Sequence, residues 1–159
     1  MSEAKPARRY TRDNWPIAAA MIQYPNILPD GSSVQDQPAE AWVATLADVT
    51  DIGFTELDPT DSWLRLADLE PSRLDEFMAV LREADITTSA ISTARRSPID
   101  PVHGDAYLAY GHKVIDTAAE VGAVAVSFGF LEALNDAQKK ALWFWTAQGP
   151  VNPDDRAVW

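Results

Sequence analysis

The chain has 159 residues, of which 47% are hydrophobic and 23% are charged, and it contains no cysteine. This composition is typical of a globular protein, and it excludes a disulfide framework, a thiol nucleophile and a cysteine-ligated metal within the chain. The formal net charge of -11 argues against a general nucleic-acid-binding surface and against a surface for anionic membranes.

The N-terminal residues 1–14 are basic and are predicted to form a flexible arm. The apolar run behind them, residues 17–22, is shorter than the hydrophobic part of a signal peptide. No segment approaches the about 20 apolar residues that a membrane helix needs. We therefore expect a cytoplasmic protein that binds neither nucleic acid nor a membrane.

The first strand–helix unit begins with residues 17–22, an apolar run between two prolines that is typical of a buried parallel strand. A long loop, residues 26–37, precedes a helix that is predicted to begin at Pro38. Gly53 stands where a C-terminal cap belongs, and a second strand, residues 54–57, follows it. The predicted apolar face of this helix comprises Trp42, Leu46, Val49 and Ile52.

The second helix has the clearest amphipathic spacing in the chain. Its apolar residues at positions i, i+3, i+4 and i+7 are Leu74, Phe77, Met78 and Leu81. Ser72 and Asp75 have the spacing of a capping box, which predicts an N-terminal cap at Ser72. The third strand is predicted at residues 86–91.

The third helix is predicted at about residues 105–121, after a loop of residues 92–104, and Gly122 ends it. The fourth strand, residues 124–128, is followed by a short helix at about residues 136–145. The apolar face of the third helix is predicted to hold Leu108, Ile115, Ala118 and Ala119.

The last residues have the features of a further helix start. Asn152 is a favourable N-cap, Pro153 suits the first helical position, and Asp154 and Asp155 favour the positive end of the helix dipole. Because so short a turn cannot offset its nucleation cost, we expect residues 15–159 to be the first four strand–helix units of a longer protein.

The alternation of strands and helices predicts an α/β fold, for which two architectures compete. A nucleotide-binding doubly wound sheet should have a glycine-rich turn after its first strand, but residues 24–31 contain one glycine, and there is no P-loop motif. An eight-stranded barrel built on this repeat would need about 250 residues. We therefore predict the N-terminal half of a (β/α)8 TIM barrel.

The active site of such a barrel lies in the loops at the carboxyl ends of its strands. After the second strand, Asp58, Asp61 and Trp63 could bind hydroxyl groups and stack on a sugar ring. The alternative is that the two aspartates form a turn and that Trp63 packs at the barrel rim.

The loop after the third strand contains two adjacent arginines and a histidine. Arg95 and Arg96 could hold a phosphate, a carboxylate or a phenolate, or they could pair with Asp100 or Asp105 and stabilise the loop. His103 could act as a general acid or base, or it could be a solvated or capping residue.

Two further loops carry aromatic or polar candidates. Gln23, Tyr24 and Asn26 follow the first strand and could line the base of a pocket. The aromatic run of residues 143–145 cannot all point to one side of a helix, so at least one ring, with Trp145 as the candidate, should face a pocket, a lid or a partner.

The chain resembles the N-terminal half of the sugar phosphate isomerase/epimerase family, which has the xylose isomerase-like barrel. The similar stretches are DIGFTEL at residues 51–57, LDEFMAVLREADI at residues 74–86 and IDTAAEVGA at residues 115–123. Two others, STARRSPIDP at residues 92–101 and ALWFWTAQG at residues 141–149, resemble the catalytic α subunit of bacterial C-glycoside deglycosidases.

The resemblance implies a substrate, a metal and partners. The substrate would be a sugar or sugar conjugate, and the partner a small β subunit or further copies of the chain. The cofactor would be one divalent metal, manganese or magnesium, whose carboxylate and histidine ligands belong to later barrel strands and are not in this chain.

Two functions stay open at this point. The first is a metal-dependent sugar-converting enzyme of the isomerase or epimerase type, with cleavage of the C–C bond of 3-keto-C-glycosides as a narrower possibility. The second is a non-catalytic half-barrel that assembles with itself or binds a partner, because an open half-barrel leaves two strand edges unpaired.

Overall fold

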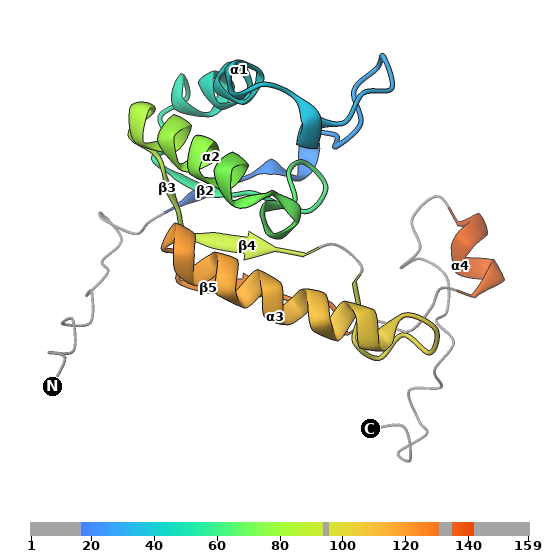
Figure 1. Ribbon diagram of the computed structural model, residues 1–159. Helices are drawn as coiled ribbons and strands as arrows, with labels where there is room; N and C mark the ends of the chain where they lie inside the picture. The colour runs from blue at the N-terminus through green and yellow to red at the C-terminus, as the bar shows by residue number, and fades with distance from the viewer. Residues whose placement is uncertain (1–16, 94–95, 131–134, 142–159) are drawn as a thin grey trace, which may run out of the picture.

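A computed structural model describes residues 17–93, 96–130 and 135–141 of the chain, in which strands and helices alternate (Figure 1). The predicted arm of residues 1–14 and the two candidates Arg95 and Trp145 lie outside the described residues. The elements are β1 (Ala18–Ala20), η1 (Met21–Gln23), η2 (Val34–Asp36), α1 (Ala39–Thr50), β2 (Glu56–Asp58), η3 (Leu66–Asp68), α2 (Pro71–Glu83), β3 (Thr87–Thr88), β4 (Ala90–Ser92), α3 (Gly104–Val121), β5 (Ala125–Ser127) and α4 (Asp136–Lys140), where η marks a 3-10 helix.

The strands are parallel and follow the order of the chain. β1 pairs with β2 and β2 with β3, while β4 pairs with β5. The predicted third strand is therefore divided at Ser89, whose N–H donates to the carbonyl of Leu57 and whose carbonyl accepts from Val124. Because Ser89 bonds to both neighbours, β3 and β4 act as one strand position between β2 and β5.

The core lies between the strands and the helices. Ala19, Leu57 and Ile91, at the middle of β1, β2 and β4, are buried with the inward residues of the helices. Phe77 of α2 meets the edges of two indole rings, those of Trp42 and Trp63, at centroid distances of 5.8 Å and 6.2 Å. In Figure 1, α1 and α2 lie side by side, and α3 runs along β4 and β5.

The ends of the helices confirm part of the predictions for α1. Trp42, Leu46 and Val49 are buried, but Ile52 is 73% exposed, so its assignment to the apolar face was wrong. The reason is that the helix ends at Thr50 and the chain reverses through Gly53, which has a φ of 92°. Such a positive φ is what a glycine cap provides.

The start of α2 differs from the predicted capping box. The helix begins at Pro71, its N-cap is Glu70, and no side chain caps it, so the prediction of a cap at Ser72 was wrong. Proline at the first helical position has a fixed φ that suits a helix start and lacks the N–H that would need a cap.

The buried side of α3 also differs from the prediction. Ala118 is buried as predicted, together with Val114 and Thr117. Leu108 and Ile115 are 52% and 50% exposed, and Ala119 is exposed as well, so these three assignments were wrong. α3 contacts η3, β4 and β5, and its buried positions at i, i+3 and i+4 are Val114, Thr117 and Ala118, a stripe that begins one residue before the predicted Ile115. The helix at residues 136–145 is shorter than predicted, because α4 ends at Lys140. Among the described residues, no helix has the length and hydrophobicity needed to cross a membrane.

Candidate functional site

Polar side chains meet at the carboxyl ends of the strands. Asp58 is the last residue of β2 and Ser92 the last of β4. The two oxygens of the Asp58 carboxylate accept the Ser92 N–H at 2.9 Å and the Ser92 hydroxyl at 2.7 Å. Ser92 lies in register with Ser127, the last residue of β5. A carboxylate held in one orientation and two hydroxyl groups therefore share this end of the sheet.

The face of the strands that turns away from the helices carries small or polar side chains. We call it the inner face, and none of its residues is fully buried. Strand pairing places Glu56 between Ala18 and Thr87, and Asp58 beside Ala20. Bulky aliphatic residues usually fill the inside of a TIM barrel. The inner face comprises Ala18, Ala20, Glu56, Asp58, Thr87, Ala90, Ser92, Ala125 and Ser127.

Arg96 joins the loop after β2 to α3. Its guanidinium lies 3.6 Å from the Asp61 carboxylate and 3.3 Å from that of Asp68. It also stacks on the Tyr110 ring, 3.6 Å from the ring centroid. The Tyr110 hydroxyl donates to Asp61 at 3.2 Å. We call these four residues the Arg96 cluster.

The electrostatics of the Arg96 cluster keep Tyr110 protonated. Burial, followed by the negative charge of Asp61, raises the pKa of the Tyr110 phenol far above its ordinary value, and Arg96 opposes this in part. The phenol therefore remains a hydrogen-bond donor to Asp61 over the whole neutral range. Tyr110 was missed in the sequence, although it stands four residues before the buried Val114 on the same side of α3.

The fold and these contacts can be set against solved structures. The chain is 42% identical to a xylose isomerase-like TIM barrel protein from Mycobacterium smegmatis in complex with magnesium, with a TM-score of 0.81 over 94% of the chain. The chain has the fold of half a xylose isomerase-like TIM barrel. It spans 48% of the length of that neighbour. No family model and no curated protein matches the chain.

Two of the residues predicted to bind substrate, Trp63 and Arg96, are engaged in contacts within the chain. Trp63 is 1% exposed and packs on Phe77, which favours the interpretation that its indole belongs to the core. Arg96 pairs with carboxylates, as one alternative held, but its partners are Asp61 and Asp68 and not the predicted Asp100 or Asp105.

Asp100 is engaged within its own loop. Its carboxylate accepts the backbone N–H groups of Val102 and His103 at 2.9 Å and 2.8 Å. The hydrogen bond from the His103 N–H, and to a smaller extent the one from Val102, lowers the pKa of the Asp100 carboxyl. His103 itself occupies the N-cap position of α3 without a side-chain cap, and its exposed ring lies 5.7 Å from that of Tyr107. Its role as an acid or base stays a prediction.

The residues after β1 divide in a similar way. The Tyr24 hydroxyl donates to Asp48 of α1 at 3.2 Å, so the ring packs beside that helix. The carbonyl of Asn26 accepts the N–H of Val34, which closes the long loop on itself. Gln23 is exposed and ends η1.

A metal site would need at least three converging ligands. Within residues 17–93, 96–130 and 135–141, no three side chains of histidine, aspartate or glutamate come together in this way. The described part of the half-barrel therefore does not fit a divalent metal by itself.

Proposed function

We propose that this chain supplies the first half of a sugar-converting barrel enzyme of the isomerase or epimerase type. The observation that carries the proposal is the row of polar groups at the carboxyl ends of β2, β4 and β5, on the fold of a xylose isomerase-like barrel. Substrates of TIM barrels bind at this end of the strands.

The chemistry of this row suits a hydroxyl-rich ligand. The Asp58 carboxylate keeps lone pairs that can accept sugar hydroxyls, because Ser92 uses one position on each oxygen. Ser127 is exposed and can donate or accept. The small side chains around them leave room for a ring, since Ala20 and Ala90 also belong to the inner face. In this proposal the chain binds and orients the sugar.

The remaining chemistry would come from outside the described residues. In enzymes of this type a divalent metal such as magnesium or manganese polarises a carbonyl oxygen, which eases removal of the neighbouring proton. The described residues offer no metal site, so we assign none of them to metal binding. In this proposal, as the family resemblance implies, the metal ligands would come from later strands of the complete barrel.

The test uses the complete barrel that contains this chain, supplied with magnesium and a panel of ketoses in deuterated water. We expect NMR to detect deuterium entering the sugar next to its carbonyl, and Asp58→Asn to lower kcat/KM at least about tenfold. The matched control is Glu40→Gln on the exposed surface of α1, which should leave the rate unchanged. Absence of exchange with every ketose, or an unaffected Asp58→Asn variant, would contradict the proposal.

A narrower form of the proposal is cleavage of the C–C bond of 3-keto-C-glycosides, with a small β subunit as partner. Its support is the resemblance of residues 92–101 and 141–149 to deglycosidase α subunits, together with the aromatic run of residues 143–145. A flat aglycone would suit such rings. Turnover of simple ketoses without any turnover of 3-keto-C-glucosides would rule out this form.

The second candidate function, a self-assembling or partner-binding half-barrel, is favoured by one observation. Within the described residues, β1 pairs only with β2 and β5 only with β4, which leaves an open parallel edge on each. Open edges favour association. A cooperative, well-folded dimer of the 159-residue chain in size-exclusion chromatography would support this candidate.

A further inference from the structure

The loop after β2 makes a backbone hydrogen bond to the end of β4. The N–H of Asp61 donates to the carbonyl of Ser92 at 3.0 Å, while the N–H and the hydroxyl of Ser92 donate to the Asp58 carboxylate. Ser92 therefore bonds to both ends of residues 58–61. Between these ends Pro59 is fully buried, and its ring fixes its φ. Contacts that hold Asp61 in place thus also hold the Ser92 groups that orient Asp58.

The Arg96 cluster supplies such contacts from the helix side. The Asp61 carboxylate accepts the Tyr110 hydroxyl at 3.2 Å and lies 3.6 Å from the Arg96 guanidinium, and the side chain of Asp61 is 5% exposed. A buried carboxylate is stable only when hydrogen-bond donors and positive charge lie beside it. These contacts therefore fix the Asp61 side chain, and with it the backbone N–H that reaches Ser92.

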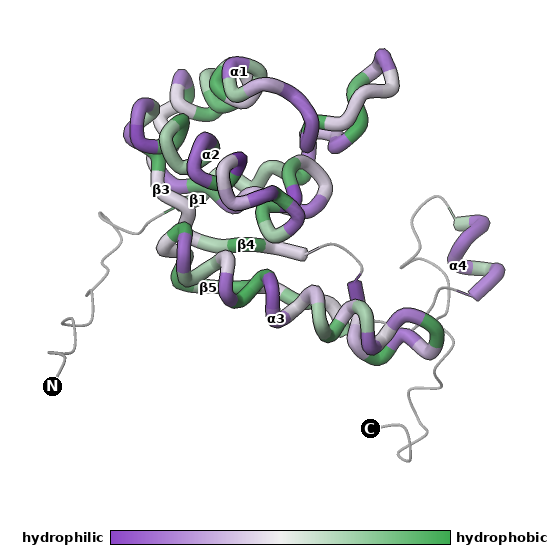
Figure 2. The backbone as a smooth tube through the Cα atoms, in the orientation of Figure 1, coloured by the Kyte–Doolittle hydropathy of each residue, from purple (hydrophilic) through white to green (hydrophobic). Residues whose placement is uncertain are grey.

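Tyr110 belongs to a firmly packed helix. Figure 2 shows hydrophobic segments alternating with hydrophilic ones along α3. Val114, one turn after Tyr110 on the same side, is fully buried, and α3 contacts η3, β4 and β5. A side chain on such a helix is positioned more precisely than one on a loop, so the Tyr110 phenol can set the position of a loop residue.

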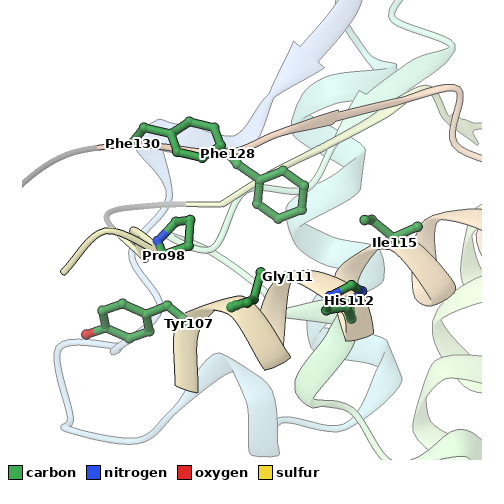
Figure 3. A pocket seen from close by; sticks show the side chains of 8 residues that line it. Pro98, Tyr107, Gly111, His112, Ile115, Phe128 and Phe130 are labelled. Atoms are coloured by element: carbon green, nitrogen blue, oxygen red, sulfur yellow. The ribbon is translucent and has the colours of Figure 1, made fainter. Parts of the chain in front are cut away.

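A second tyrosine of α3 has different surroundings. Tyr107 lines an apolar groove with Gly111 and Phe128, and Figure 3 shows its hydroxyl pointing away from the other labelled side chains. No hydrogen bond joins the Tyr107 hydroxyl to another of the described residues. Tyr107 and Tyr110 are thus a matched pair on one helix, of which one hydroxyl bonds to Asp61 and the other does not.

The end of β4 is also tied to β5. Thr93 donates its N–H at 2.9 Å and its hydroxyl at 3.0 Å to the carbonyl of Ser127, the last residue of β5. These two bonds could hold the strand end without α3. They lie on the β5 side of the strand, however, whereas the bond from Asp61 lies on the β2 side, where Asp58 is.

We propose that Tyr110 is a positioning residue for the Asp58 carboxylate. Its hydroxyl holds Asp61, whose N–H holds Ser92. Ser92 in turn orients the carboxylate. The part that Asp58 plays in binding sugar hydroxyls rests on the proposed function, and a carboxylate that is already ordered binds its ligand at a lower entropic cost.

Kinetics of the complete barrel that contains this chain separate positioning from a purely structural role. Tyr110→Phe keeps the ring on which Arg96 stacks and removes the hydroxyl. We expect it to lower kcat/KM for the sugar about fivefold when Asp58 is present, but less than about twofold in an Asp58→Ala background, because the hydroxyl acts through Asp58. Tyr107→Phe, the matched control, should leave kcat/KM unchanged. Equal losses in the two backgrounds would overturn the proposal, since they would indicate a general loss of structure or a direct contact of Tyr110 with the substrate.

Hydrogen exchange tests the same relay without a substrate. Isotope labelling of serine allows NMR to follow the amides of Ser92 and Ser89 in one sample, and the Ser89 N–H bonds to the Leu57 carbonyl in the same strand position. We expect Tyr110→Phe to speed exchange at Ser92 about tenfold and to leave Ser89 unchanged. An unchanged Ser92 would overturn the proposal and show that the bonds to β5 hold this strand end alone. Equal acceleration at Ser89 would overturn it too, because it would mean general loosening.

The two measurements also distinguish this proposal from the proposed function. A barrel that turns over no sugar, or an Asp58→Ala variant with full kcat/KM, would refute the proposed function, and exchange at Ser92 would still decide whether Tyr110 positions Asp58. If Tyr110→Phe does not fold, Asp61→Asn takes its place, because it removes the charge beside Arg96 and keeps the backbone N–H. The same faster exchange at Ser92 is expected, and an unchanged rate would overturn the proposal.

Discussion

The pair α1 and α2 differs from α3 in how its apolar residues are covered. Phe77 of α2 is fully buried between Trp42 and Trp63, whereas Leu108 and Ile115 of α3 stay half exposed. All three residues occupy apolar positions of amphipathic helices. Phe77 is covered by Trp42 of the preceding helix and by Trp63 of the loop after β2. The amphipathic pattern shows which side of a helix is apolar, but it does not show whether a neighbouring element covers that side.

The largest expected effect is in the covered region. Phe77→Ala should lower the free energy of unfolding by about 3–5 kcal/mol, because it removes a ring that contacts two indoles and leaves a cavity. Urea denaturation measures the change.

The matched control for Phe77 is Ile115→Ala on α3, where half of the side chain is already exposed. Its cost should stay below about 1 kcal/mol. Equal losses in the two variants would mean that the Ile115 side of α3 is as well covered as the Phe77 side of α2, and the comparison would fail.

The next effect concerns the Arg96 cluster, which holds α3 to the loop after β2. Arg96→Met removes the guanidinium beside Asp61, whose side chain is 5% exposed, and we expect a loss of about 1–3 kcal/mol. Arg82→Met, at an exposed position of α2, should cost less than about 0.5 kcal/mol.

A binding role for Arg96 would show differently. If Arg96 binds substrate instead, its replacement should change KM or kcat/KM of the complete barrel with little change in Tm. An unchanged Tm in Arg96→Met would therefore contradict the assignment of this side chain to the cluster.

The third effect contrasts two glycines of α3. A Cβ on Gly104 would lie 2.6 Å from the carbonyl oxygen of Pro98, so Gly104→Ala must displace the loop and should cost about 1–2 kcal/mol. Gly111 sits inside the helix with space for a methyl group, so Gly111→Ala should stabilise by about 0.5–1 kcal/mol. Thermal unfolding of both variants tests whether the start of α3 is tightly packed. A Gly104→Ala variant more stable than Gly111→Ala would contradict this.

The architecture could be predicted because its signals are local. Each unit repeats a short apolar strand and an amphipathic helix, and Gly53 and Gly122 cap two of the helices. This regular alternation indicates parallel strand–helix units. The boundary errors have local causes too, such as the fixed φ of Pro71, which moved the helix start away from Ser72.

The candidate site could be predicted less well, because its contacts join distant parts of the chain. Arg96 meets Asp61, Asp68 and Tyr110 from three separate elements, and no spacing in the sequence specifies such a pairing. The location of Asp58 at a strand end followed from the repeat. Its hydrogen bonds to Ser92 required the register of the sheet.

The smallest expected effect lies at the ends of the helices, where α2 differs from its neighbours. At Gly53, Asp85 and Gly122 the same pair of backbone hydrogen bonds closes the helix. At Asp85, for example, its own N–H donates to the carbonyl of Arg82, and the N–H of the next residue, Ile86, donates to the carbonyl of Leu81. Asp85 has a φ of 53°, in the left-handed region that glycine adopts without strain. Asp85→Gly should therefore stabilise the protein by about 0.5–1 kcal/mol.

The control for Asp85 is Asp51, the same residue type at the end of α1 but with a right-handed φ of -61°. Asp51→Gly gains no strain relief and raises the entropy of the unfolded chain, so it should destabilise by about 0.5–1 kcal/mol. Urea denaturation of both variants measures opposite signs if backbone strain decides the outcome. A shared sign would mean that side-chain contacts of the two aspartates, rather than φ, control the ends of α1 and α2.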